Sequence, residues 1–265
     1  FIVSHAPFWH IGNSIAEKKI NIVLAALVAL IPGIYTYGIS AFAVVSLSVS
    51  TAMGWEFLMN KLTKQPVSIQ DGDAALIGLL FSMIIPATTP WWVVTIGTFL
   101  AIFIGKQIFG GIGANPFNPV LIGLAILRIS WGDFFDFDKA LINYDPGFDM
   151  RYPLVALKSF GTEAIESFST MDLLLGRQSG GIGATFGIGL ILGGIYLIMR
   201  GFIRWEIPVS FLAGIFITAL IFNQYDPNRY AAPLFHLFTG YTLIGAFFLA
   251  TEDSSSPVNF LPMLI

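Results

Sequence analysis

Between two apolar segments lies the sequence Gly105-Lys106-Gln107-Ile108-Phe109-Gly110-Gly111-Ile112-Gly113-Ala114-Asn115-Pro116-Phe117-Asn118-Pro119. Its glycines allow the backbone to approach a ligand or another helix closely, and its prolines prevent a regular helix. Such irregular backbone is tolerated within a membrane only where it is buried in protein or lines a site. The stretch therefore predicts a membrane protein with discontinuous helices and a site at the break.

Two asparagines in this break, Asn115 and Asn118, offer both hydrogen-bond donors and acceptors. This combination suits the imide and ring nitrogens at the edge of a flavin or a quinone. With such a ligand, both amides would face one cavity, close to the backbone of Gly110–Gly113. The alternative is a plain helix break whose amides only cap freed backbone groups, and the residues alone favour that alternative.

The composition is that of a membrane protein. Of the 265 residues, 55% are hydrophobic and 11% are charged, whereas a soluble domain usually carries about 25% charged residues. The formal net charge of −3 is too small to indicate nucleic-acid binding. Cysteine is absent, which excludes disulfides, thiolate metal sites and iron–sulfur clusters held by this chain. The sequence predicts no catalytic residue and no metal ligand.

Apolar segments recur along the whole chain, and about 20 apolar residues are needed to cross about 30 Å of hydrocarbon. They predict an all-α polytopic fold with about eight spans, two of which are too short to cross the membrane as regular helices. The predicted spans are Ile20–Tyr37, Ile39–Met59, Ala74–Pro86 (short), Trp91–Gln107, Pro119–Trp131 (short), Ile182–Met199, Ile207–Asn223 and Pro233–Thr251.

Basic residues indicate the orientation. Threaded through alternating spans, seven of them fall on one side, which the positive-inside rule assigns to the cytoplasm together with the N-terminus. The loop Gly132–Gly180 is then extracytoplasmic, and its eight carboxylates outnumber its four basic residues. The seven basic residues are Lys18, Lys19, Lys61, Lys64, Lys106, Arg200 and Arg204.

Weak internal repetition is also present. Gly-Gly-Ile-Gly-Ala occurs at Gly110–Ala114 and again at Gly180–Ala184, and Ile77–Phe81 is echoed by Ile244–Phe248. Repeats are common in transport folds and place sites near the membrane midplane. Apolar five-residue matches also recur by chance, so a true pseudo-repeat and a coincidence both stay open.

Taken in order, these motifs resemble the signature of the RnfD/NqrB family, the flavin-carrying membrane subunits of Rnf- and Nqr-type ion-translocating electron-transfer complexes. The absence of an extra N-terminal extension makes the chain more similar to RnfD. Family members have about ten spans, so residues 1–265 are expected to form a single membrane domain that is cut at both ends. The matching segments are Asp71-Gly72, Pro86–Trp92, Gly105–Gln107, Gly110–Gly113, Asn115–Pro119, Gly181–Gly183, Ile191–Gly194, His236–Gly240, Gly245–Thr251 and Ser256-Pro257.

The resemblance implies an inner-membrane subunit of a bacterial or archaeal translocase, which acts only within its complex. Such subunits bind flavin and relay electrons between an outer-face flavoprotein and other carriers, while the complex moves Na⁺ or H⁺. By this resemblance Asn115 and Asn118 match an Asn-x-x-Asn motif associated with buried riboflavin, with Gly111 and Gly113 beside it. Glu56 matches an acidic position implicated in cation uptake.

One departure concerns covalent FMN, which family members usually carry on a threonine of an outer loop. Here Tyr152 stands where that threonine is expected, directly before the matching segment Pro153–Lys158. The nearest literal match, ending at Thr185, aligns better with a different Gly-rich turn of the family. We therefore expect no covalent FMN on Tyr152 or Thr185, and instead a riboflavin or FMN held without a covalent bond.

Two other classes stay open on the sequence alone. Broken helices and pseudo-repeats serve solute pathways equally well, so a permease or channel with a urea-transporter-like fold is an alternative. The other alternative is a structural membrane subunit whose covalent flavin site has been lost. Glu252 and Asp253, at the end of the last span, are either solvated or part of a cation entry.

Overall fold

The computed structural model describes residues 14–66, 68–137, 152–165, 168–257 and 259–264, and these residues form helices and loops without strands. Four segments are long and apolar enough to cross a membrane, and three shorter apolar helices lie between them. The long segments are α1 (Ile15–Tyr37), α2 (Ile39–Leu62), Trp91–Phe109 with α4 (Trp91–Phe103) at its start, and α10 (Glu206–Tyr225). The short helices are α3 (Asp73–Ile84), α5 (Pro119–Ser130) and α9 (Gly187–Met199). The prediction of an all-α polytopic membrane protein with discontinuous helices is confirmed.

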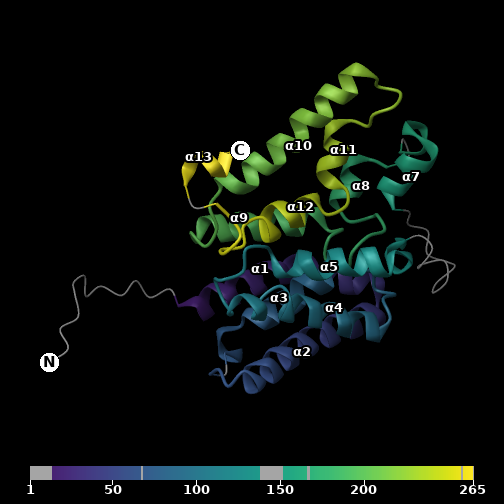
Figure 1. Cartoon of the computed structure of the whole chain (residues 1–265). Helices are drawn as coiled ribbons and strands as arrows, with labels where there is room; N and C mark the ends of the chain where they lie inside the picture. Colours follow the sequence, from purple (N-terminus) through teal and green to yellow (C-terminus); the bar gives the residue numbers. More distant parts are fainter. Residues whose placement is uncertain (1–13, 67, 138–151, 166–167, 258, 265) are drawn as a thin grey trace.

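The helices are stacked in layers (Figure 1). Helices α1 to α5 pack together on one side, α9 packs along α1, and α10 lies at the opposite edge. The remaining elements are α7 (Pro153–Phe160), α8 (Thr170–Leu174), α11 (Pro233–Phe238), α12 (Thr242–Ile244), the π-turn Gly245–Leu249, α13 (Phe260–Leu264) and the 3₁₀ turns Ile69–Asp71, Gln107–Phe109, Gly132–Phe135 and Thr162–Ile165.

Helix α3 is the centre of the first bundle. Of its 12 residues only Ala75 is not buried, which is expected of a helix that is apolar on every side and too short to span. It packs tightly on α2 at Gly78, whose carbonyl accepts a hydrogen bond of 2.6 Å from Ser48 Oγ. A Cβ atom at Gly78 would lie 2.8 Å from the backbone oxygen of Ser48, so only glycine permits this approach.

Segments from the second half of the chain complete the C-terminal end of α3. The last carbonyls of any helix lack partners within the helix, and a helix that ends inside a membrane protein must find them elsewhere. The carbonyl of Met83 accepts from the Gly183 amide at 3.0 Å, and that of Ile85 accepts from the Ile182 amide at 3.2 Å. The hydroxyl of Tyr241 donates to the carbonyl of Ile84 at 2.8 Å.

Two of the predicted spans are wrong in detail. Ile182–Met199 is helical only from Gly187, because Ile182 and Gly183 belong to a turn that bonds to the end of α3. Pro233–Thr251 is interrupted after α11, where Gly240 adopts a φ of 64° that favours glycine, before α12 and the π-turn begin.

The two Gly-Gly-Ile-Gly-Ala copies differ in structure. In the first copy Gly110, Gly111 and Gly113 have positive φ and form an open turn. In the second copy Gly181 and Gly183 lie within contact distance of Met83, where a Cβ atom would collide with it. The repeated five residues therefore serve a turn in one place and close packing in the other.

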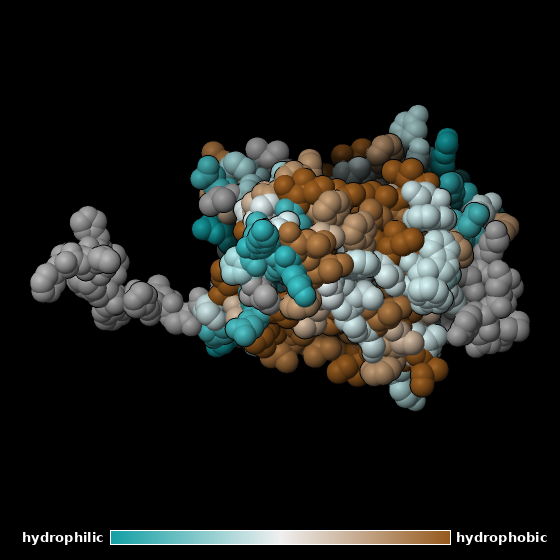
Figure 2. All heavy atoms as spheres, turned by 60° about the horizontal axis from the view of Figure 1, so that its bottom comes forward, coloured by the Kyte–Doolittle hydropathy of each residue, from teal (hydrophilic) through white to brown (hydrophobic). Residues whose placement is uncertain are grey.

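The surface matches lipid as solvent. Helix α2 exposes Ile39, Phe42 and Leu62, at 86%, 57% and 67% of their full areas. Figure 2 shows hydrophobic residues over much of this face, with hydrophilic residues gathered towards its ends. Apolar area of this extent is rare on a soluble monomer and marks contact with membrane or protein.

The close packing at Gly78 makes a direct prediction. Gly78→Ala should destabilise the protein by about 1–3 kcal/mol, because the added methyl group must displace the α2 backbone. Gly54→Ala is the matched control on α2, where a Cβ atom meets nothing within 4 Å, and it should leave stability unchanged or slightly higher. Thermal unfolding of the two purified variants measures the difference, and equal effects would contradict the packing.

Candidate functional site

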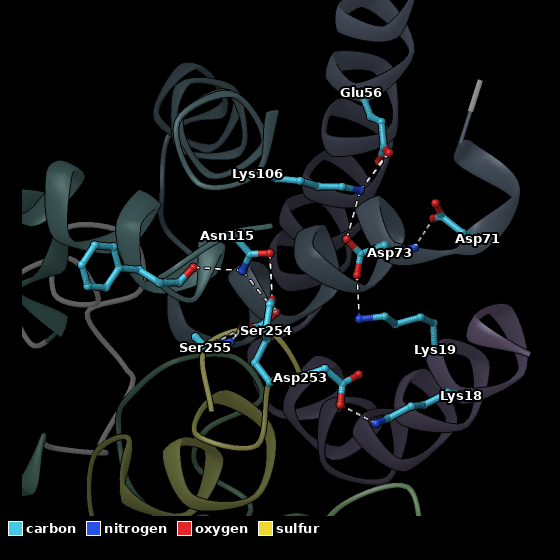
Figure 3. Close-up of polar contacts among 12 residues, drawn as sticks. Lys18, Lys19, Glu56, Asp71, Asp73, Lys106, Asn115, Asp253, Ser254 and Ser255 are labelled. Carbon is cyan, nitrogen blue, oxygen red and sulfur yellow. Dashed lines mark hydrogen bonds and ion pairs between the residues drawn. The ribbon is translucent and has the colours of Figure 1, made fainter. Parts of the chain in front are cut away.

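Four charged side chains form a buried ion network at one end of the bundle, drawn in Figure 3. Lys106 Nζ lies 2.8 Å from Glu56 Oε1 and 3.0 Å from Asp73 Oδ2, and Lys19 Nζ lies 2.7 Å from Asp73 Oδ1. The side chains of Glu56 and Lys106 are 0% and 1% exposed. Two cations thus balance two anions in a region from which water is nearly excluded.

Each member comes from a different element. Glu56 lies on the last third of α2, Asp73 begins α3, and Lys19 lies in the second turn of α1. Lys106 follows α4 at the start of the irregular stretch, where Gly105 permits contact with Pro119. The N-terminal end of α3 favours the negative charge of Asp73 through the helix dipole. The network therefore joins four elements that the sequence separates.

Buried ion pairs of this kind are costly to disturb. Removing one partner leaves an uncompensated charge in a low-dielectric region and typically costs about 3–5 kcal/mol. Ser68 Oγ also donates to Glu56 Oε1, and Asn60 Nδ2 donates to Ser68 Oγ at 2.8 Å. The other oxygen, Glu56 Oε2, is buried without a hydrogen-bond partner among the described residues. A buried carboxylate oxygen left in this state has capacity for a cation or a proton.

A third acidic residue, Asp71, flanks the network on the 3₁₀ turn before α3. Asp71 Oδ1 accepts a hydrogen bond of 2.8 Å from the backbone amide of Asp73. Burial raises the pKa of the Asp71 carboxyl, and this hydrogen bond opposes the shift. Glu56 and Asp73 raise the pKa further by repulsion, whereas Lys106 lowers it. Asp71 therefore adds a third carboxyl group at the edge of the network, and burial disfavours its charged form.

A cavity of about 200 Å³ adjoins the network. Lys19 and Asp73 form part of its wall, so the ion network and the cavity share two side chains. Asn115 and Asn118 line the same cavity, as expected for paired amides that face a common ligand. Gly113 lines it as well, whereas Gly111 is outside the lining. Acidic side chains from the end of the last span, Glu252 and Asp253, complete the polar wall.

The two asparagines have different roles. Asn118 Oδ1 accepts from the Val120 amide at 2.9 Å and caps α5, while its Nδ2 donates to the carbonyl of Leu249 at 2.9 Å. Asn115 Nδ2 reaches across the cavity wall to Glu252 Oε1 at 3.2 Å, and Ser254 Oγ donates to Asn115 Oδ1 at 2.8 Å. Asn115 Nδ2 also donates to the carbonyl of Phe117 at 3.0 Å. Asn118 thus bonds to backbone groups only, whereas Asn115 bonds to backbone and also to side-chain carboxylate and hydroxyl groups.

The other predicted site residues lie apart from this cavity. Thr185 is 5% exposed, and its carbonyl accepts a hydrogen bond from Gln178 Nε2 at 3.5 Å. The same segment contacts the C-terminal end of α1, far from Lys19, because the Gly180 amide donates to the hydroxyl of Tyr37. Tyr152 is 8% exposed, precedes α7 and packs on Phe137 with ring centroids 4.8 Å apart. Neither residue lines the cavity.

Sequence reasoning missed the partners of Glu56. From the sequence, Lys19 and Lys106 indicate only the membrane orientation, and Asp73 carries no motif that distinguishes it. An available signal was the general rule that ionisable residues within membrane segments are expensive and functional by default. Lys106 lies at the end of the predicted span Trp91–Gln107, directly before the helix break, which is the position this rule marks.

Discontinuous helices around a buried ion network define a membrane protein of the transport class. The chain belongs to the NQR2, RnfD, RnfE family, whose model matches residues 2–265. It is 36% identical over 259 residues to the D subunit of the Na(+)-translocating ferredoxin:NAD(+) oxidoreductase complex of Acetobacterium woodii, covering 97% of this chain and 78% of that protein.

Two further relatives carry related names. The D subunit of the proton-translocating ferredoxin:NAD(+) oxidoreductase complex of Clostridium ljungdahlii is 34% identical over 272 residues, covering 100% of this chain and 82% of that protein. The D subunit of the ion-translocating oxidoreductase complex of Yersinia enterocolitica is 32% identical over 289 residues, covering 96% and 82%. The family expected from the sequence motifs, and the greater similarity to RnfD, are confirmed.

The bonds of Asn118 predict a graded mutational response. Asn118→Ala should lose about 1–2 kcal/mol for the helix cap and more for the unpaired Leu249 carbonyl. Asn118→Ser keeps a capping oxygen without adding a buried charge but loses the amide that donates to Leu249, so its loss should be smaller. Thermal unfolding of both variants tests this order, and an alanine variant as stable as the parent would contradict the capping role.

Proposed function

We infer that this chain serves as the RnfD-type membrane subunit of an ion-translocating electron-transfer complex. The comparisons confirm the prediction of a membrane subunit of an ion-translocating oxidoreductase. It acts within its complex, so other subunits are its partners. The names of its relatives include both Na⁺ and proton translocation. We therefore propose that the coupling ion of this chain is a monovalent cation, either Na⁺ or a proton.

We propose that the cavity beside Asn115 receives one edge of a non-covalent flavin, riboflavin or FMN. The lining of the cavity includes the apolar side chains of Leu76, Ile77 and Leu80 of α3 together with polar groups such as Asn115 and Glu252. This mixed lining suits a flat ring system that has both apolar and hydrogen-bonding edges. At about 200 Å³ it is smaller than the roughly 300 Å³ of sites that enclose a whole ligand, so it fits an edge rather than the entire cofactor.

In this proposal the residues of the chain bind the flavin and orient its ring. Asn115 presents a donor and an acceptor to the ring edge, exchanging its bonds with Glu252 and Ser254 for bonds to the ligand while its Nδ2 keeps the bond to the Phe117 carbonyl. Asn118 fixes the start of α5 and its distance from the π-turn. Positive φ at Gly111 and Gly113 shapes the turn that carries Asn115. A bound flavin would supply the one- and two-electron chemistry.

We propose that Glu56 lies on the cation pathway. Its carboxylate is fully buried, one oxygen has no hydrogen-bond partner among the described residues, and the network beside it reaches the cavity through Asp73. A cation at this position would be held by oxygen ligands that protein supplies inside the membrane, as expected of intramembrane acids in transport proteins.

The proposed orientation follows the basic residues. Lys19, Lys106 and Arg200 lie at one end of the bundle, where Asp73 pairs with both lysines and Glu17 lies 4.0 Å from Arg200. We propose that this end faces the cytoplasm in the inner membrane, with the N-terminus on that side. The loop 132–180, which includes residues outside the described ranges, is then extracytoplasmic and docks an outer-face flavoprotein.

The observation that carries this function is the shared wall of cavity and ion network, and flavin analysis tests it. Asn115→Ala in the purified complex should remove one equivalent of acid-released flavin, because the ring edge loses its polar contact. Asn21→Ala is the control: that amide is also buried, but it bonds to Glu17 and Tyr196 outside the cavity.

Two results of this experiment would contradict the proposal. The first is an unchanged content of acid-released flavin in Asn115→Ala. The second is flavin that stays on this polypeptide after acid denaturation, which would show covalent attachment and favour an acceptor such as Thr185. A complex with no flavin on this subunit at all would favour the permease or structural alternatives.

A further inference from the structure

Lys106 occupies the place that a bound cation would take in the ion network. Its Nζ lies between Glu56 Oε1 and Asp73 Oδ2, at 2.8 and 3.0 Å, and the side chain is 1% exposed. The backbone of Lys106 is held firmly, because its carbonyl accepts the amides of Phe109 and Gly111. The ammonium group nevertheless ends a flexible four-carbon stem, so it can move between its two carboxylate partners.

The charges around Lys106 are distributed unequally. Asp73 has a second cation, Lys19, at 2.7 Å, whereas Lys106 is the only ion-pair partner of Glu56 among the described residues. The carboxyl group of Asp71 lies nearby and accepts a hydrogen bond from the backbone amide of Asp73 at 2.8 Å. If Lys106 moved towards Asp73, Glu56 would be left as a buried carboxylate with its Oε2 already unpartnered. A mobile monovalent cation is the charge that this carboxylate then requires.

The cavity is placed to drive this movement. Lys19 and Asp73 belong both to its wall and to the network, so charge that enters the cavity acts directly on the partners of Lys106. Negative charge in the cavity attracts the ammonium groups of Lys19 and Lys106 and weakens the ion pair between Lys106 and Glu56. Electrostatic effects of this kind are strong over short distances where water is excluded.

We propose that Lys106 is a tethered cation that holds Glu56 in the resting state and yields this place to the transported cation when negative charge enters the cavity. The proposal rests on the proposed roles of Glu56 and of the cavity. One electron from a low-potential carrier of the complex adds one negative charge, and one Na⁺ or proton enters at Glu56. The buried net charge is unchanged, and Lys106 acts as a positioning residue.

Chemical rescue in the purified complex tests this role. Lys106→Met leaves Glu56 without its tethered cation, so the subunit should be less stable and should regain stability when a free cation replaces Lys106. The readout is the temperature at which half of the tagged subunit stays soluble, followed by immunoblot. Replacing choline by Na⁺ at constant ionic strength, or lowering the pH, should raise this temperature by several degrees in the variant and much less in the parent.

Matched variants separate this role from a merely structural one. Lys18→Met removes a lysine from an exposed ion pair with Asp253 and should show no cation-specific rescue. Lys106→Arg keeps the tethered charge and should behave as the parent does. Lys106→Met combined with Glu56→Gln removes both charges of the pair, so its stability should no longer depend on Na⁺ or on acid.

Each outcome is decisive. Rescue by Na⁺ supports the proposal with Na⁺ as the cation, and rescue by acid alone supports it with the proton. The proposal is overturned if neither Na⁺ nor acid stabilises Lys106→Met. It is also overturned if Na⁺ or acid still stabilises the double variant. The role of Glu56 is tested separately by Glu56→Gln, so loss of transport in that variant without rescue in Lys106→Met would overturn only the inference about Lys106.

Discussion

Charge neutrality inside a water-poor bundle constrains this structure more than any other requirement. Lys106 reaches Glu56 and Asp73 at once, and Lys19 provides the second cation. Because an unpaired charge there costs several kcal/mol, the ends of α1, α2, α3 and the segment after α4 must meet at one place. The break that begins at Gly105 makes this meeting feasible, since Gly105 lets Pro119 approach to a distance that a Cβ atom would block.

A helix too short to span the membrane can lie at the centre of the bundle because both of its ends find partners. Helix α3 is too short to span, begins at the ion network with Asp73 and ends where segments from the second half bond its carbonyls. Backbone groups within a membrane must all find partners, and the Tyr241 hydroxyl and the Ile182 and Gly183 amides supply them. Hydrogen bonds thereby join the two halves of the chain at the C-terminal end of α3, and the ion pairs of Asp73 fix its N-terminal end.

Long apolar runs made the outer helices predictable. The span expected at Ile39–Met59 is observed as Ile39–Leu62, because hydropathy over about 20 residues reports a lipid-facing helix well. The same measure failed at Ile182–Phe186, a segment that is not helical and in which Ile182 and Gly183 are buried and bond to the end of α3. Such tertiary use of a short apolar segment cannot be read from local sequence. For the same reason the positions of Lys19 and Lys106 in the sequence predicted the orientation in the membrane but not the carboxylates with which these lysines pair.

We propose that electron transfer and cation movement meet at the wall shared by the cavity and the ion network. The most direct measurement is the number of cations moved per electron by the complex in proteoliposomes, comparing the parent with Glu56→Gln. The account predicts that the variant loses cation transport and that its remaining electron transfer no longer responds to the cation. An unchanged number of cations per electron in Glu56→Gln would contradict it.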